Sequence, residues 1–269
     1  GHFEDKMEQA ADFRDETEAL FALIAPLEDA AFEETTQFKG WTINDVVRHL
    51  HFWNRAAGFQ LSDEAELQRL IGGAVSTAGG MRAFEREELK GLSGRELAAA
   101  WRKTAGEVAG LYSGADPKRR LKWAGPDMSA RSSITARLME TWAHGQEVYD
   151  ELGVVRRNAD RIRNIVVLGN NTYGWTYKVR GMEPPNPRPH LRLTAPSGEI
   201  WTYNDPSEAE LIEGAADQFC QVVTQIRNIA DTTLRVVGPN AADWMSKAQC
   251  FAGAAEPPPP PGARRTRKP

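Results

Sequence analysis

The sequence has very little cysteine and no long run of apolar residues. Among its 269 residues are two cysteines, Cys220 and Cys250. Both have apolar neighbours, which argues against a disulfide framework and is typical of a reducing cytoplasm. No run of about 18 apolar residues occurs, so no membrane-spanning helix is predicted. A net charge of −4 gives no general attraction to nucleic acid or anionic lipid. We therefore expect a cytoplasmic protein that binds neither nucleic acids nor membranes.

Helical patterns dominate residues 1–155. Four segments carry apolar residues at helical spacing or begin with a capping-box pattern, and together they predict a helix bundle. The stretch 58–93 between the second and third predicted helices contains GGAV and AGG, which predicts a shorter helix and a loop over one end of the bundle. The four helices are expected from about Lys6 to Ile24, from Thr42, from Ser93 with Glu96, and from Ser129 or Ser132 to Gly153.

The composition changes after residue 155, where strands are expected. HLRLTAPSGEIWTYN predicts two strands with Leu191, Leu193, Ile200 and Tyr203 buried, and residues 209–226 predict an amphipathic helix. A short strand and a last helix complete a small α+β domain over residues 156–255. The proline-rich basic tail, residues 256–269, is predicted to be disordered. The expected fold is thus mainly α and α+β overall.

The strongest chemical signal is a pair of side chains, Glu140 and His144, four residues apart in a helical segment. This spacing places both on one helix face. His49 lies on another predicted helix, on the same stripe as Val46 and Trp53. Burying a histidine and a carboxylate unpaired is costly, and a shared metal ion removes that cost. We therefore predict a divalent metal held between two helices by His49, Glu140 and His144.

His51 is the other histidine that this helix offers. It lies two residues from His49, about 200° around the helix, so helical phase favours His49. Two imidazoles and one carboxylate suit Zn²⁺, and the same set suits Fe²⁺ or Ni²⁺. Three protein ligands leave one coordination position open, which favours chemistry over a purely structural site. Spacing alone also leaves open a buried histidine–carboxylate pair without a metal.

Two segments resemble a known family. WTINDVVRHLHFWN contains a Trp, a polar turn, Asp-Val and His-Leu, and ARLMETWAHGQEVYDELG contains a Glu, three residues, a His and Glu-Val. They resemble the metal-binding helices of the mycothiol-dependent maleylpyruvate isomerase family, within the DinB-like superfamily of four-helix bundles. The resemblance spans roughly residues 8–155 and continues faintly beyond. The matching residues are Trp41, Asp45, Val46, His49 and Leu50, then Glu140, His144, Glu147 and Val148.

The resemblance implies zinc at His49, Glu140 and His144 and a chemistry based on a small thiol. In the family, the metal binds the thiol of a cofactor such as mycothiol and lowers its pKa. The thiolate attacks an electrophilic carbon, and the outcome is either cis–trans isomerisation or thiol transfer. The resemblance therefore implies two small-molecule partners, a thiol and an electrophile.

Four further residues are candidates for this site. Arg82, on an expected loop after Gly79 and Gly80, is a candidate to hold a substrate carboxylate. Arg227 ends a predicted helix where the related C-terminal domains often carry an arginine facing the active site. Trp53 and Trp142 flank the ligands and are candidates for the wall of the cofactor pocket. The simpler alternatives are a surface arginine for Arg82, a helix-terminal cation for Arg227 and core residues for Trp53 and Trp142.

The sequence thus predicts a metal-dependent thiol transferase or mycothiol-dependent isomerase, as a monomer or homodimer. One alternative is a non-catalytic DinB-like metal-binding or stress-response protein. Another is a carrier of lipids or small molecules built on the C-terminal module.

Overall fold

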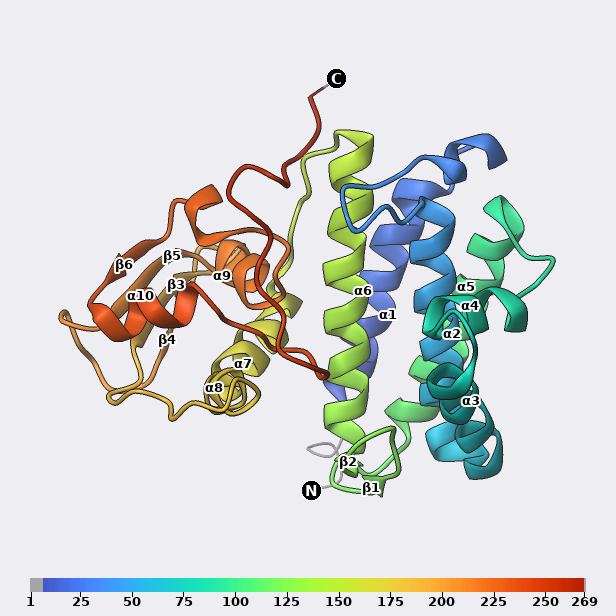
Figure 1. Cartoon of the computed structure of the whole chain (residues 1–269), viewed down its shortest axis with the longest axis horizontal. Coiled ribbons are helices and arrows are strands. Elements are labelled where there is room, and N and C mark those ends of the chain that lie inside the picture. Colours follow the sequence, from blue (N-terminus) through green and yellow to red (C-terminus); the bar gives the residue numbers. More distant parts are fainter. Residues whose placement is uncertain (1–6, 269) are drawn as a thin grey trace. The chain divides into compact units, whose positions relative to one another are not determined.

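The computed structural model describes residues 7–268 and consists of two units, one up to Glu151 and one from Leu152 onward (Figure 1). The predicted fold class is confirmed, because the first unit is mainly helical and the second contains a small mixed sheet with short helices. Within the described range, no helix has both the length and the apolar character that a membrane crossing requires.

Four long helices build the first unit, as predicted, and helix α5 packs against both α1 and α2. The predicted start at Lys6 lies outside the described residues. A two-stranded ladder of β1 and β2 precedes α6. The bounds are α1 (Glu8–Ile24), η2 (Asp29–Glu33), α2 (Ile43–Ser62), α3 (Glu64–Ser76), α4 (Met81–Glu88), α5 (Gly94–Ser113), β1 (Arg120–Leu121), β2 (Met128–Ser129) and α6 (Ala130–Leu152).

The two predicted capping boxes have different outcomes. At α2, the Thr42 hydroxyl accepts a hydrogen bond from the Asp45 amide at 3.1 Å and the Asp45 carboxylate accepts one from the Thr42 amide at 3.0 Å, as predicted. At α5, the predicted box is wrong, since the Ser93 side chain caps nothing. Instead, the Gly94 amide donates to the side-chain oxygen of Asn44 at 2.7 Å, so a residue 50 positions away caps this helix.

The segment between α2 and α5 was predicted as one short helix and a loop, but it forms two helices, α3 and α4. The buried side chains of Leu67 and Leu70 on α3 and Leu89 after α4 pack against Phe52 of α2. Helix α4 lies close to α3, because Gly73 has no side chain and the Phe84 ring fits into the space this leaves. This packing fixes α4 beside α2.

The second unit contains a four-stranded sheet in the order β4-β3-β5-β6. Strands β3 and β5 are parallel, and both outer strands are antiparallel to their neighbours. Helix α9 packs on β3 and β5. The bounds are η3 (Asp160–Ile162), α7 (Arg163–Asn171), α8 (Tyr173–Lys178), β3 (His190–Thr194), β4 (Ile200–Tyr203), β5 (Leu211–Ala215), α9 (Ala216–Val223), η4 (Ile229–Asp231), β6 (Arg235–Val237) and α10 (Pro239–Met245).

Three expectations for this unit need correction. The predicted hairpin forms, but Trp201 is buried while Ile200 is 57% exposed, because the register pairs Trp201 with Leu193 on the inner face. The helix predicted over 209–226 begins with strand β5 and becomes helical at Ala216. The tail, residues 256–269, was predicted to be disordered, yet side chains of the unit bind its first part. Asn228, for example, donates to the Pro259 carbonyl at 3.0 Å.

Candidate metal centre

The structure brings His49 of α2 together with Glu140 and His144 of α6. One candidate ligand atom from each residue lies within 4.8 Å of the other two. Nε2 of His144 is 3.2 Å from a Glu140 oxygen, and the centroids of the two imidazole rings are 4.9 Å apart. His51, the alternative on α2, is not part of the group.

These separations fit a metal ion. Ligand atoms about 2.0–2.2 Å from a tetrahedral zinc are about 3.4 Å from one another. The candidate atoms lie within 4.8 Å of one another, so they need to approach by at most about 1.4 Å, which side-chain torsions supply. The donor set, two imidazoles and one carboxylate, suits a divalent cation. The group could thus hold a metal.

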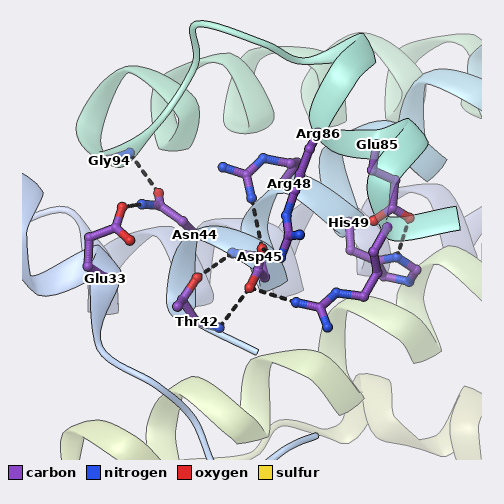
Figure 2. Close-up of polar contacts among 10 residues, drawn as sticks. Glu33, Thr42, Asn44, Asp45, Arg48, His49, Glu85, Arg86 and Gly94 are labelled. Carbon is purple, nitrogen blue, oxygen red and sulfur yellow. Dashed lines mark hydrogen bonds and ion pairs between the residues drawn. The ribbon is translucent and has the colours of Figure 1, made fainter. Parts of the chain in front are cut away.

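Each histidine of the group is held through Nδ1 by a buried carboxylate. Nδ1 of His49 is 2.8 Å from an oxygen of Glu85, as Figure 2 shows. Nδ1 of His144 is 3.0 and 3.1 Å from the two oxygens of Glu147. A carboxylate beside Nδ1 accepts its hydrogen bond, so each Nδ1 carries a proton and Nε2 is the nitrogen that remains to bind a metal. Carboxylates placed in this way fix the orientation of metal-binding histidines and raise their basicity.

Sequence reasoning missed the role of Glu85. It lies on α4, its side chain is 3% exposed, and the same oxygen also accepts a hydrogen bond from Nε1 of Trp53 at 3.1 Å. The local sequence contains Glu85, Glu87 and Glu88 close together, so nothing in it distinguishes the residue that reaches His49. Glu147, by contrast, could have been found, since it lies three residues after His144 on the same helix.

An ion cluster on Asp45 holds α4 against α2. The carboxylate of Asp45 accepts hydrogen bonds from Arg48 at 2.9 Å, from Arg82 at 2.9 Å and from Arg86 at 3.2 Å. Arg82 and Arg86 belong to α4 and Arg48 belongs to α2, and Figure 2 shows Arg48 and Arg86 beside Asp45. Burial would raise the pKa of Asp45, but the hydrogen bond from the Thr42 amide and the charges of Arg86 and Arg82 outweigh burial and lower it. The cluster therefore supports the helix that carries Glu85.

Glu140 and His144 shift each other's pKa. Burial would raise the pKa of Glu140, but the hydrogen bond and the charge of His144 outweigh burial and lower it. Burial would lower the pKa of His144, but the carboxylates of Glu147 and Glu140 outweigh burial and raise it. Without a metal the two residues therefore form an ion pair at neutral pH. A metal ion binding there displaces a proton from His144.

Aromatic rings cover the two histidines. The Trp41 ring stacks on the His144 imidazole with centroids 5.4 Å apart and planes 6° apart, and it meets the His49 ring edge-on at 5.1 Å. The Arg82 guanidinium lies 4.8 Å from the centre of the Trp41 ring. Arg82 was expected on a loop, but it belongs to α4. It is therefore one aromatic ring away from the histidines, and its side chain is 32% exposed.

The other predicted site residues have different positions. The Trp53 ring is 6.5 Å from the His49 ring, next to the group. Trp142 is 0% exposed, and its role in the wall of a pocket stays a prediction. It lies two residues from both Glu140 and His144, about 200° around α6, which turns it away from these two ligands. Arg227 belongs to the second unit, where its guanidinium bonds to the Ile226 carbonyl at 3.1 Å. Its role at the metal group stays a prediction.

Comparisons with known proteins found one matching family model and two similar sequences. The family model described as "Mycothiol maleylpyruvate isomerase N-terminal domain" matches residues 13–149. Two proteins of Mycobacterium tuberculosis, "Uncharacterized protein MT0041" (strain CDC 1551 / Oshkosh) and "Uncharacterized protein Rv0036c" (strain ATCC 25618 / H37Rv), are each 37% identical over 243 residues. The alignments cover 90% of this chain and 95% of each relative.

Two solved structures share the fold. A crystal structure of the mycothiol-dependent maleylpyruvate isomerase aligns with a TM-score of 0.52 and 16% identity, over 80% of this chain and 87% of that one. A histidine-to-alanine mutant of the same enzyme aligns with a TM-score of 0.51, 16% identity and the same coverage. At this identity the likeness concerns the fold alone.

Proposed function

The chain belongs to the mycothiol maleylpyruvate isomerase N-terminal domain family, and on this premise we propose that it is a metal-dependent enzyme acting on a low-molecular-weight thiol. The thiol, mycothiol or a similar compound, adds to an electrophilic small molecule, and the product is either a thiol adduct or a cis–trans isomer. The observation that carries the proposal is the three-ligand group, His49, Glu140 and His144, which leaves a coordination position open.

A divalent metal bound there, most simply Zn²⁺, supplies a Lewis acid that favours the deprotonated form of a thiol. The protein's own residues prepare this position. Glu85 and Glu147 hold the proton of each imidazole on Nδ1 and direct Nε2 into the group. Trp41 covers both imidazole rings, which excludes water from that side and strengthens electrostatic interactions at the group. Arg82, one ring away and partly exposed, is placed to attract an anionic partner.

The first test is the metal content of protein expressed in defined medium. We expect about one equivalent of a divalent metal in the wild type and less than about 0.2 equivalents in His144→Ala, because two remaining ligands bind a metal weakly. The matched control is His51→Ala, which removes a buried histidine of the same helix that is not part of the group and should keep the metal. Equal and negligible metal in all three proteins would refute the metal site.

The second test separates an enzyme from a metal-binding protein without turnover. The metal-loaded protein is incubated with mycothiol or glutathione and a panel of electrophiles, namely activated alkenes, epoxides and alkyl halides. Saturable thiol consumption that a chelator abolishes supports the enzyme. A full metal content without thiol consumption for any pair would instead favour the non-catalytic DinB-like protein.

A further inference from the structure

Three arginines share one aspartate beside the metal group. Oδ1 of Asp45 accepts hydrogen bonds from Arg48 and Arg86, as Figure 2 shows. Oδ2 accepts from Arg82 and from the Thr42 amide, so both oxygens of the carboxylate are fully used. Within residues 7–268, no other carboxylate pairs with any of the three arginines. The cluster therefore carries an excess of two positive charges.

Holding α4 against α2 does not need three arginines. A single guanidinium can bind a carboxylate through two parallel hydrogen bonds and neutralise it. Here each guanidinium gives Asp45 one of its five donors. Arg82 and Arg86 are one turn apart on α4, a spacing at which two like charges destabilise a helix. The cluster thus keeps positive charge and unused donors at a cost in stability, which a bound anion would offset.

Solvent reaches both the cluster and the metal group. The side chain of Arg86 is 55% exposed and that of Arg82 is 32% exposed. In the metal group, the side chain of Glu140 is 25% exposed. A small molecule in solution can therefore contact the guanidinium groups and also a candidate metal ligand.

The cluster lies at the distance that a small molecule spans from the metal group. Asp45 precedes His49 by four residues on α2, which is about 6 Å along the helix. The Arg82 guanidinium is 4.8 Å from the centre of the Trp41 ring, and that centre is 5.1 Å from the centre of the His49 ring. The guanidinium is therefore at most about 10 Å from the His49 ring. A reactant the size of a tripeptide, at about 3.3–3.6 Å per residue, spans this distance.

We propose that Arg48, Arg82 and Arg86 form a subsite for the anionic end group, a carboxylate or a phosphate, of one of the two reactants. This inference rests on the proposed function, because the thiol and the electrophile are the molecules that meet at the metal group. The unused guanidinium donors bind the oxygens of the end group. Asp45 holds the three side chains together when the subsite is empty. The subsite thus binds a reactant by its far end, while its reacting atom lies at the metal group.

The test is calorimetric binding of sulfate to the metal-loaded full chain at low ionic strength, because sulfate is a dianion that coordinates zinc weakly. We expect saturable binding. Arg86→Gln should weaken it about threefold to tenfold, since one charged donor is lost. Asp45→Asn should strengthen it about threefold or more, because it removes the competing negative charge and keeps an acceptor oxygen for the Thr42 amide. A purely structural cluster would instead lose stability in Asp45→Asn without any gain in sulfate affinity.

The matched control is Arg131→Gln, which removes an exposed positive charge about 20 Å from His144 along α6. It should leave the sulfate affinity within about twofold of the wild type. No sulfate binding by the wild type would overturn the subsite. Equal affinity in the wild type and in Arg86→Gln, which sulfate bound to the metal alone would give, would also overturn it. The Arg86→Gln result is decisive even if Asp45→Asn fails to fold, because Arg86 is mostly exposed.

Competition identifies the reactant that carries the anion. If glutathione displaces sulfate at a lower concentration than S-methylglutathione, the end group belongs to the thiol, because only the free thiol also reaches the metal. If glutathione saturates the protein and sulfate stays bound, the subsite serves the electrophile. Equal displacement by the two compounds would separate the cluster from the metal group and overturn the proposal.

Thiol consumption is measured on the same samples, so that the two proposals can fail separately. Sulfate binding that depends on Arg86, without thiol turnover for any pair of reactants, would sink the proposed enzyme and leave the anion site. Thiol turnover without sulfate binding would sink the subsite alone.

Discussion

Replacing Glu85 tests whether the carboxylate that holds the predicted ligand His49 contributes to metal affinity. The same Glu85 oxygen accepts from Nδ1 of His49 at 2.8 Å and from Nε1 of Trp53 at 3.1 Å. In Glu85→Gln the amide oxygen can take this place and keep both hydrogen bonds, so only the negative charge is lost. In Glu85→Ala both bonds are lost and His49 becomes free to rotate.

The expected magnitudes follow from this difference. Loss of a carboxylate behind a metal-binding histidine weakens metal affinity about 10-fold to 100-fold, which is about 1.4–2.7 kcal/mol. We expect Glu85→Gln near the lower value and Glu85→Ala near the upper one. The assay is competition for Zn²⁺ with a chromophoric chelator at fixed pH, alongside thermal unfolding of each metal-free variant.

The control for this experiment is Glu87→Gln, which removes an exposed carboxylate of the same helix. It should bind Zn²⁺ as tightly as the wild type. The reasoning would be refuted if Glu85→Ala also kept the wild-type affinity while remaining folded. His49 would then be oriented by its packing against Trp41 and Trp53 rather than by the carboxylate.

Three further predictions concern pH, packing and capping. Because the pKa of His144 is raised, a metal that binds there displaces a proton. Metal affinity should therefore fall at least about tenfold for each unit by which the pH is lowered from about 8 to about 6. A metal affinity that does not change with pH in chelator competition would contradict this. Gly73→Ala places a Cβ on the Phe84 ring and should lower the free energy of unfolding by about 1–3 kcal/mol and weaken metal binding. Its control, Gly72→Ala, meets open space and should stabilise α3 by up to about 1 kcal/mol. Urea unfolding measures both changes in stability. Thr42→Ala removes the cap of α2 and should cost about 1 kcal/mol in the same assay, and no loss would mean that the arginines on Asp45 fix the helix start alone.

Local patterns predicted most of the fold because each helix of the bundle carries its own signals. The apolar spacing of α1, the capping box of α2 and the turn of the β3–β4 hairpin are properties of short segments. The predictions were wrong where a residue far away in the sequence determines the local structure. Ser93 was expected to cap α5, but Asn44 reaches the Gly94 amide from another helix. Strand β5 resembled the start of a helix, and pairing with β3 on one side and β6 on the other makes it a strand.

The sequence by itself determined the three residues of the metal group, because two of them are one turn apart on a helix and helical phase selects the third over His51. Only the tertiary structure decided how the group is supported. Glu85 reaches His49 across 36 residues of sequence, and Arg82 reaches Asp45 across 37. No periodicity records such contacts, since they depend on which helices face each other. The open coordination position is thus predicted by spacing, while the residues that set its charge and orientation become visible only in the folded chain.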